Sequence, residues 1–103
     1  MVTRGEIWWH EHPVRGRRPY LILSRPESIP VLNQLFAVPV TRTIRGIPTE
    51  VLLDKADGMP SGCVLSLDNV SMVRKSLFTK RITALGPEKM AAVCEALKIA
   101  TSC

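Results

Sequence analysis

The sequence predicts a small, mainly β domain that ends in one C-terminal helix (an α+β fold class), and three observations lead to this prediction. The chain has 103 residues, which suits a single domain over residues 1–103 with one hydrophobic core. Hydrophobic residues make up 46% and charged residues 22% of the chain, the proportions of a globular protein. Eight prolines and six glycines separate short apolar runs, as they do where strands alternate with tight turns.

Six apolar runs are the predicted strands. We expect them over residues 6–9, 18–24, 35–41, 49–53, 63–67 and 80–85. Residues 10–17 are predicted to form a loop, because Pro13, Gly16 and several charged residues interrupt the apolar pattern. Pro39 predicts that the third strand is an edge strand or carries a bulge. So few strands leave no hollow barrel interior, and a ligand is therefore expected on the outer face or between loops.

The C-terminal segment has the features of a helix. Gly86, Pro87 and Glu88 follow the last predicted strand; proline is favoured at the first helical position, and an acidic residue stabilises the first turn. Apolar residues then recur at spacings of three and four, which predicts one buried helix face. That face comprises Met90, Val93, Cys94, Leu97 and Thr101.

Positive charge is concentrated in the first half of the sequence. The chain carries 14 Lys and Arg against 9 Asp and Glu, a net charge of +5. Residues 1–48 contain seven Arg, no Lys and three acidic residues, and so carry +4 of this charge. Because Arg presents a planar fork of donors that matches phosphate oxygens, this half favours nucleic acid or another polyanion as a partner. A GC-rich coding sequence would also favour Arg over Lys.

Several classes of protein are excluded. No apolar run approaches the ~18 residues of a membrane span, and residues 1–5 lead into a strand rather than a signal peptide. We therefore expect a cytoplasmic protein with no membrane contact. Cys63, Cys94 and Cys103 are an odd number without CxxC spacing, unlike a disulfide framework or a zinc site. We expect no metal and no cofactor, with Cys63 and Cys94 buried and Cys103 free.

Two short segments contain candidate phosphate-binding residues. In Arg15-Gly16-Arg17-Arg18-Pro19, three guanidinium groups fall at the junction of the predicted loop and the second strand. The strand would fix the position of Arg18, whereas a solvated loop with incidental charge is the alternative interpretation. Thr41 ends the third predicted strand and precedes Arg42 and Arg45. Alone, its hydroxyl indicates no more than a strand former or a turn residue.

A set of segments in a fixed order makes these observations more specific. They are Arg4-Gly5-Glu6-Ile7-Trp8, Arg18 to Ser24, Ala37 to Thr41, Pro48 to Val51, Cys63 to Asn69 and Arg81 to Leu85. In this order, and over nearly the whole chain, they closely resemble the MazF/PemK family of toxin endoribonucleases.

The resemblance implies an SH3-like small barrel of the MazF, CcdB and Kid type, assembled as a homodimer. It implies metal-independent cleavage of single-stranded RNA to a 2′,3′-cyclic phosphate and a 5′-hydroxyl, and an antitoxin whose flexible acidic segment occupies the RNA groove. The family's catalytic Arg, which precedes a proline in the second strand, falls on Arg18, and its catalytic Thr falls on Thr41. In the plasmid branch an Asp after the fifth strand transfers protons, and Asp68 matches it.

The chemistry of these side chains suits different roles. Arg18 stays protonated and cannot be the base, but it can stabilise a pentacovalent phosphorane. Asp68 is the candidate base, with a turn or cap formed with Asn69 as the alternative. Because few aromatic side chains are available for stacking on bases, we expect mainly Arg in the RNA groove. The expected RNA-binding residues are Arg15, Arg17, Arg25, Arg42, Arg45 and Asn69.

Two features depart from the family pattern, and both bear on RNA sequence preference. The loop over residues 10–17 is shorter than in most relatives and lacks the late catalytic His of the plasmid branch. His10 and His12 lie at its start, and we expect them to be ordinary surface residues. In addition, Ser24-Arg25-Pro26 stands where many members have an Asn-Asp pair.

Two other functions remain open on the sequence alone. A CcdB-like toxin would bind DNA gyrase without catalysis, although such a protein has no need for both Arg18 and Thr41. A non-catalytic SH3-like RNA-binding module would bind RNA with a strong dependence on salt and would leave no new RNA ends.

Overall fold

The computed structural model describes residues 1–103 and consists of seven strands, three short 3-10 helices and one α-helix. The strands are β1 (Glu6–His12), β2 (Gly16–Ile22), β3 (Gln34–Thr41), β4 (Glu50–Leu53), β5 (Cys63–Ser66), β6 (Ser71–Arg74) and β7 (Phe78–Ala84). The 3-10 helices are η1 (Lys55–Asp57), η2 (Leu67–Asn69) and η3 (Lys75–Leu77), and the α-helix is α1 (Pro87–Thr101).

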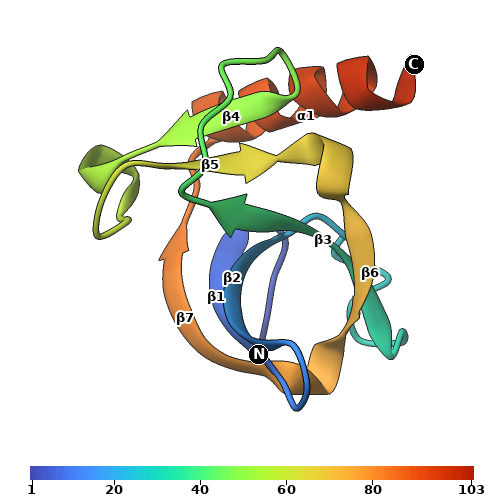
Figure 1. The fold of residues 1–103 in the computed structure, drawn as a ribbon. Helices are drawn as coiled ribbons and strands as arrows, with labels where there is room; N and C mark the ends of the chain where they lie inside the picture. The colour runs from blue at the N-terminus through green and yellow to red at the C-terminus, as the bar shows by residue number, and fades with distance from the viewer.

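The strands form one curved antiparallel sheet. Their order is β4-β5-β3-β2-β1-β7, and β6 pairs with β3. β7 bends around the lower part of the molecule and connects through η3 to β6, which closes a barrel-like ring with β3, β2 and β1, while α1 lies against β4 and η2 (Figure 1). The predicted mainly β fold with a C-terminal helix is confirmed.

β3 is the central strand and changes partner along its length. Residues 34–37 pair with β6, whereas Val40 and Thr41 pair with β5. Pro39 lies between these two ladders, opposite Tyr20 of β2. A proline has no N–H to donate to a ladder, and this change of partner is where β3 accommodates one. β3 is therefore not an edge strand.

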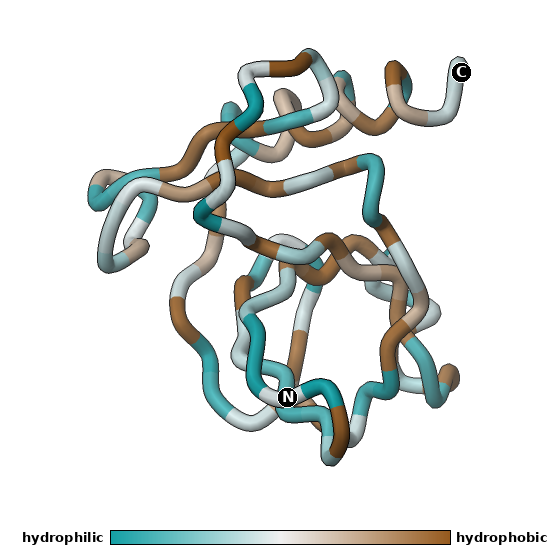
Figure 2. The backbone as a smooth tube through the Cα atoms, viewed as in Figure 1, coloured by the Kyte–Doolittle hydropathy of each residue, from teal (hydrophilic) through white to brown (hydrophobic).

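Two apolar clusters hold the sheet in shape. The larger contains 13 buried residues and joins strands β1 to β5 to Val93 and Ala96 of α1. The smaller includes Ile22 and Leu35. Leu21 belongs to the larger cluster and its neighbour Ile22 to the smaller, because successive strand residues point to opposite faces. Hydrophobic stretches recur along β5 and α1 (Figure 2), and each fully buried Leu or Ile stabilises the fold by about 1.5–3 kcal/mol.

The predicted loop over residues 10–17 is wrong, because β1 and β2 form a tight hairpin there. β1 continues to His12, β2 begins at Gly16, and only residues 13–15 make the turn. His12 Nδ1 accepts hydrogen bonds from two backbone N–H groups of the turn, at 3.1 and 3.0 Å. Gly16 has a φ of 85°, which a residue with a side chain adopts only at a cost. These local features close a turn within a segment whose composition resembles a loop.

Two further sequence expectations differ from the structure. β6 lies outside the predicted strands, because only Val73 of its four residues is buried and the apolar signal is correspondingly short. In α1, which starts at Pro87 as predicted, Cys94 and Thr101 are exposed. The buried positions are Val93 and Ala96, so the packed face is rotated relative to the predicted one. α1 is also too short and too polar to span a membrane.

Candidate functional site

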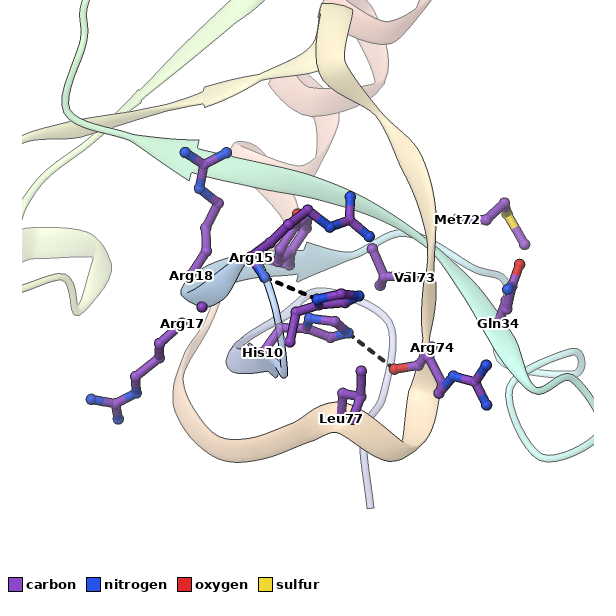
Figure 3. Close-up of a pocket in the computed structure, with 12 residues that line it drawn as sticks. His10, Arg15, Arg17, Arg18, Gln34, Met72, Val73, Arg74 and Leu77 are labelled. Atoms are coloured by element: carbon purple, nitrogen blue, oxygen red, sulfur yellow. Dashed lines mark hydrogen bonds between the residues drawn. The ribbon is translucent and has the colours of Figure 1, made fainter.

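Arg18 and Thr41 lie just past the paired part of β2 and β3. The last pair of this ladder is Tyr20 of β2 with Pro39 of β3, and Arg18 and Thr41 each lie two residues beyond it, on neighbouring strands. In Figure 3 the Arg18 side chain extends toward the end of β3. A basic side chain and a hydroxyl side chain thus lie at the same end of the β2–β3 pair.

The Thr41 hydroxyl has its hydrogen available for a ligand. Its Oγ1 accepts a hydrogen bond from the backbone N–H of Thr43 at 3.2 Å, which orients the side chain. A hydroxyl is one donor and also an acceptor, so the O–H of the half-buried Thr41 can still donate to a phosphate oxygen. Thr41 lines a small hollow of about 140 Å³ together with Arg42.

The three arginines of the hairpin do not converge. Arg18 points toward the end of β3, whereas Arg17 points the opposite way (Figure 3). The Arg17 guanidinium stacks 4.0 Å from the centre of the Trp9 ring and lies 3.8 Å from the Glu11 carboxylate. Arg15 is the last residue of the turn and lines a large pocket that Arg18 also borders. Alternation along β2 separates Arg17 from Arg18, because neighbouring strand residues face opposite sides.

The remaining candidate arginines lie on ordered turns with free side chains. The Glu50 carboxylate accepts backbone N–H groups from Arg45 at 3.0 Å and Gly46 at 2.9 Å, which fixes the turn after β3. The Arg25 carbonyl accepts the backbone N–H and the hydroxyl of Ser28 at 3.0 and 2.9 Å. None of the guanidinium groups of these turns takes part in an ion pair. Their positive charge is therefore available to an anionic ligand.

The fold places Asp68 away from Thr41. Thr41 pairs with Val64 near the start of β5, whereas Asp68 lies in η2, beyond the end of that strand. Asp68 is exposed, and its Oδ2 accepts a hydrogen bond of 2.5 Å from the Thr49 hydroxyl. The neighbouring Asn69 donates from Nδ2 to a serine hydroxyl of β5 at 2.9 Å. Both polar side chains hold the β5–η2 junction together.

His10 is a buried residue of the site and not the surface residue that the sequence suggests. It is 5% exposed, and its ring lies edge-on to Tyr20 and Phe78 at centroid distances of 5.4 and 4.8 Å. Its Nε2 donates to the Arg74 carbonyl at 3.1 Å. Burial lowers the pKa of His10, and the nearby charges of His12 and Arg15 lower it further. One signal in the sequence was available, since His10 falls two residues after Trp8 on the same strand face.

The site offers anion-binding groups and no cluster of metal ligands. No group of three or more His, Cys, Asp or Glu side chains comes together anywhere in the chain. The functional groups at this end of the β2–β3 pair are the Arg18 cation and the Thr41 hydroxyl. Such an arrangement can bind a phosphate and stabilise negative charge that develops on it.

The chain matches one protein family over nearly its whole length. Residues 3–101 match the family described as PemK-like, MazF-like toxin of type II toxin-antitoxin systems. A curated relative from Mycobacterium tuberculosis, a probable endoribonuclease named MazF5, is 40% identical over 100% of this chain and 95% of its own length. A second, the probable endoribonuclease MazF2, is 35% identical over 99% of this chain and 100% of its own length.

Solved structures have the same fold. The Mycobacterium tuberculosis toxin MazF-mt6 superposes with a TM-score of 0.82 and 30% identity, covering 92% of this chain and 96% of that one. MazF from a MazE–MazF crystal structure of Deinococcus radiodurans superposes with a TM-score of 0.81 and 27% identity, covering 97% and 94%.

Proposed function

The chain belongs to the PemK-like, MazF-like toxin family of type II toxin–antitoxin systems. We propose that it is an endoribonuclease that cleaves single-stranded RNA, with the phosphate of the cut bond held by Arg18 and Thr41. The observation that supports this position of the cut is that Arg18 and Thr41 lie at the same end of the β2–β3 pair, two residues past its last paired residues. The two alternative functions, a CcdB-like gyrase-binding toxin and a non-catalytic RNA-binding module, are not favoured by the family match.

The proposed reaction is an internal transesterification. The 2′-oxygen bonds to phosphorus, the bond from phosphorus to the 5′-oxygen breaks, and the proton lost by the 2′-hydroxyl is balanced by one gained by the leaving 5′-oxygen. Arg18 binds the phosphate and stabilises the charge of the phosphorane, because it carries a fixed cation with several donors. Thr41 donates its O–H to a second phosphate oxygen. The products are a 2′,3′-cyclic phosphate and a 5′-hydroxyl.

Unpaired arginines around this pair supply the RNA groove in the proposal. Arg15, Arg25, Arg42 and Arg45 are exposed and form no ion pair, so each can neutralise a phosphate. Arg17 stands apart because its cation already lies beside Trp9 and Glu11. Asn69 would contact RNA only if the bound RNA chain extends beyond η2.

The same positive surface suits a regulatory partner. We propose that a cognate antitoxin covers the groove with a flexible acidic segment, since solved relatives include an endoribonuclease in complex with its cognate antitoxin and a MazE–MazF complex. We also propose a cytoplasmic homodimer, in line with what the family resemblance implies. The chain's net charge of +5 supports attraction of an acidic segment.

Cleavage of a structure-poor RNA in the presence of EDTA tests the enzymatic proposal. We expect fragments whose 5′ ends accept a label from polynucleotide kinase directly and whose 3′ ends carry a cyclic phosphate. An RNA with a 2′-deoxynucleotide at the cut position should remain intact, because it lacks the attacking oxygen. A requirement for a divalent metal, or cleavage of the deoxy substrate, would refute this mechanism.

The same preparation separates the alternatives. RNA that binds with a strong salt dependence but yields no 5′-hydroxyl ends would identify a binding module. Intact RNA together with specific retention of DNA gyrase would identify a gyrase-directed toxin.

A further inference from the structure

The β3–β4 connection, residues 42–49, follows directly on the Thr41 hydroxyl. Thr41 ends β3 near the start of β5, whereas Glu50 begins β4 at the end of β5, so the connection runs back along β5 (Figure 1). Residues 42–48 are exposed, and only Thr49 is buried. Because an exposed segment has few packing contacts, its hydrogen bonds determine how firmly it is held.

The end of the connection next to β4 is anchored to the body of the fold. The Thr49 hydroxyl donates to Asp68 Oδ2 at 2.5 Å. The backbone N–H of Glu50 donates to the Ile47 carbonyl at 3.1 Å, which closes a β-turn with Pro48 at its second position, where proline is favoured. These contacts fix the place from which the Glu50 side chain extends.

The middle of the connection is held by the Glu50 side chain alone. Its Oε1 accepts the backbone N–H groups of Arg45 at 3.0 Å and Gly46 at 2.9 Å, and its Oε2 lies 3.3 Å from the same Arg45 nitrogen. Gly46 has a φ of 69°, and a turn with such a residue can direct successive N–H groups at one anion. One carboxylate thus connects the middle of the segment to β4.

The beginning of the connection sets the polarity of the Thr41 hydroxyl. The backbone N–H of Thr43 donates to Thr41 Oγ1 at 3.2 Å. Apart from this bond and those to Glu50, residues 42–46 make no hydrogen bond within the chain. Since Oγ1 accepts from Thr43, the hydroxyl keeps its own hydrogen for another acceptor. Thr43 lies only two residues before Arg45, so the carboxylate that holds Arg45 also restrains the Thr43 N–H.

We propose that Glu50 is a positioning residue, which acts through the β3–β4 connection to hold the Thr41 hydroxyl as a donor to the phosphate of the cut bond. Glu50 itself does not contact the RNA, because its oxygens already accept N–H groups and a carboxylate repels a phosphate. A donor that is fixed in advance stabilises the transition state without reorganisation, and a small displacement of it slows the reaction. The inference rests on the proposed function for the role of Thr41.

Rate and affinity should respond to Glu50 in different ways. Glu50→Ala should lower the single-turnover rate about 10- to 100-fold, since a displacement of about 1 Å at a reacting group can cost about 100-fold. It should bind an uncleavable RNA at least as tightly as wild type, because it removes a negative charge from an arginine-containing segment. Glu50→Gln also removes the charge but keeps an acceptor oxygen, so its rate should stay within about threefold of wild type.

Glu6→Ala is the matched control for these variants. The Glu6 carboxylate also accepts a backbone N–H, from Thr3 at 2.9 Å, but it lies at the start of β1 and makes no contact with the β3–β4 connection. Glu6→Ala should therefore lower stability without lowering the cleavage rate of the folded chain. A Glu50→Ala rate equal to that of wild type, or an equal loss in Glu6→Ala, would overturn the inference.

A double-mutant cycle separates positioning from a general loss of structure. Thr41→Ala removes the hydroxyl on which Glu50 is proposed to act. Adding Glu50→Ala to it should lower the rate by less than about twofold, because residues that act through one another are not additive. Full losses that multiply in the double variant would show that Glu50 does not act through Thr41.

NMR of the free chain tests the positioning without RNA. In wild type the Thr41 side chain should occupy one staggered rotamer, and the Thr43 amide hydrogen should exchange more slowly than in Glu50→Ala. Unchanged Thr41 couplings in Glu50→Ala would overturn the inference whatever the chain does to RNA. If wild type cuts no RNA but Glu50→Ala releases the Thr41 side chain, the proposed function fails and the positioning stands. If wild type cuts RNA and Glu50→Ala cuts it equally fast, only the positioning fails.

Discussion

Five arginines of the first half of the chain and three cations of β7 and α1 differ in whether they have a carboxylate partner. In β7 and α1, Arg81 lies 3.1 Å from Glu6, Lys89 lies 3.4 Å from Asp57, and Lys98 lies 3.4 Å from Glu95. We define the arginine surface as five arginines of the first half of the chain, none of which has a carboxylate partner. Its members are Arg15, Arg18, Arg25, Arg42 and Arg45.

The difference separates charges that stabilise the fold from charges that await a ligand. An ion pair within the chain is satisfied before any partner arrives, whereas an unpaired guanidinium on a fixed backbone gains its partner only on binding. Net charge alone does not distinguish these cases. Each prediction below removes a charge or polar group on one side of this division and measures both stability and RNA chemistry.

Arg18→Ala gives the largest expected effect. Loss of one oriented donor to the charge that develops in the transition state should lower the cleavage rate about 100- to 1,000-fold. Arg18→Lys should recover only part of this loss, because an ammonium lacks the planar fork. Single-turnover cleavage measures the rate, and urea unfolding should give a free energy within ~0.5 kcal/mol of wild type. Full activity of Arg18→Ala would remove this residue from the mechanism.

Salt should weaken RNA binding far more than it weakens folding. For single strands the logarithm of affinity falls with the logarithm of salt concentration by about 0.7 per phosphate neutralised. Arg15→Met combined with Arg42→Met should therefore reduce that slope by about 1.4, measured with an uncleavable RNA. Lys98→Met, with a carboxylate partner in α1, should leave the slope unchanged. Equal slopes for the double variant and wild type would contradict the distinction between ion-paired cations and unpaired arginines.

Asp68→Asn tests whether a carboxylate beyond β5 takes part in the reaction. We expect the rate of cleavage to stay within about threefold of wild type, because the fold sets Asp68 and Thr41 at different ends of β5 and the effect of such a surface change is small. The amide can still accept the Thr49 hydroxyl hydrogen bond. A loss as large as that of Arg18→Ala would instead identify Asp68 as the base.

The sequence is sufficient for the strands with long apolar runs and for the start of α1. It is not sufficient where a short contact decides the structure: the two hydrogen bonds to His12 convert an apparent loop into a hairpin. Within this hairpin His10 packs between Tyr20 and Phe78 and is buried, whereas its place in a polar segment suggests a surface residue. The prediction that Cys94 is buried is wrong for a related reason, since the spacing of apolar residues defines the buried face of a helix only to within one residue.

The candidate site was predictable in part. Resemblance to the family points to Arg18 and Thr41, and the pairing of β2 with β3 explains why both residues lie at the same end of these strands. The family resemblance cannot reveal that the Arg17 side chain faces Trp9, because the direction of that side chain depends on where β2 begins. The pocket beside His10 depends on β6, whose four residues carry too little apolar character to predict.

Stability should fall as the pH drops below about 6.5, and His10 should account for part of the fall. The folded pKa of His10 is lowered by burial from its ordinary value of 6.5, so between these two values the unfolded chain binds more protons than the folded one. Unfolding free energy therefore decreases as the pH falls through that window. His10→Gln should flatten the profile there, as measured by urea unfolding between pH 5 and 8. Parallel profiles for variant and wild type would show that the proton is taken up elsewhere.

The smallest effects come from the ion pairs of the C-terminal region, and they differ among themselves. Lys98 and Glu95 are both highly exposed, at 63% and 71%, so Lys98→Met should change the unfolding free energy by less than ~0.5 kcal/mol. The Glu6 side chain is only 16% exposed, and this burial by itself raises its pKa. Hydrogen bonds from Trp8 and Thr3, together with the Arg81 cation, nevertheless hold the pKa of Glu6 below its usual value. Stability from Glu6 is therefore present above its unfolded pKa and lost as the pH falls through the folded value. Arg81→Met should move the acid end of the unfolding profile to higher pH, whereas Lys98→Met should not, and neither should alter RNA cleavage at pH 7. If Arg81→Met lowered cleavage while Glu6→Gln did not, this cation would belong with the arginine surface.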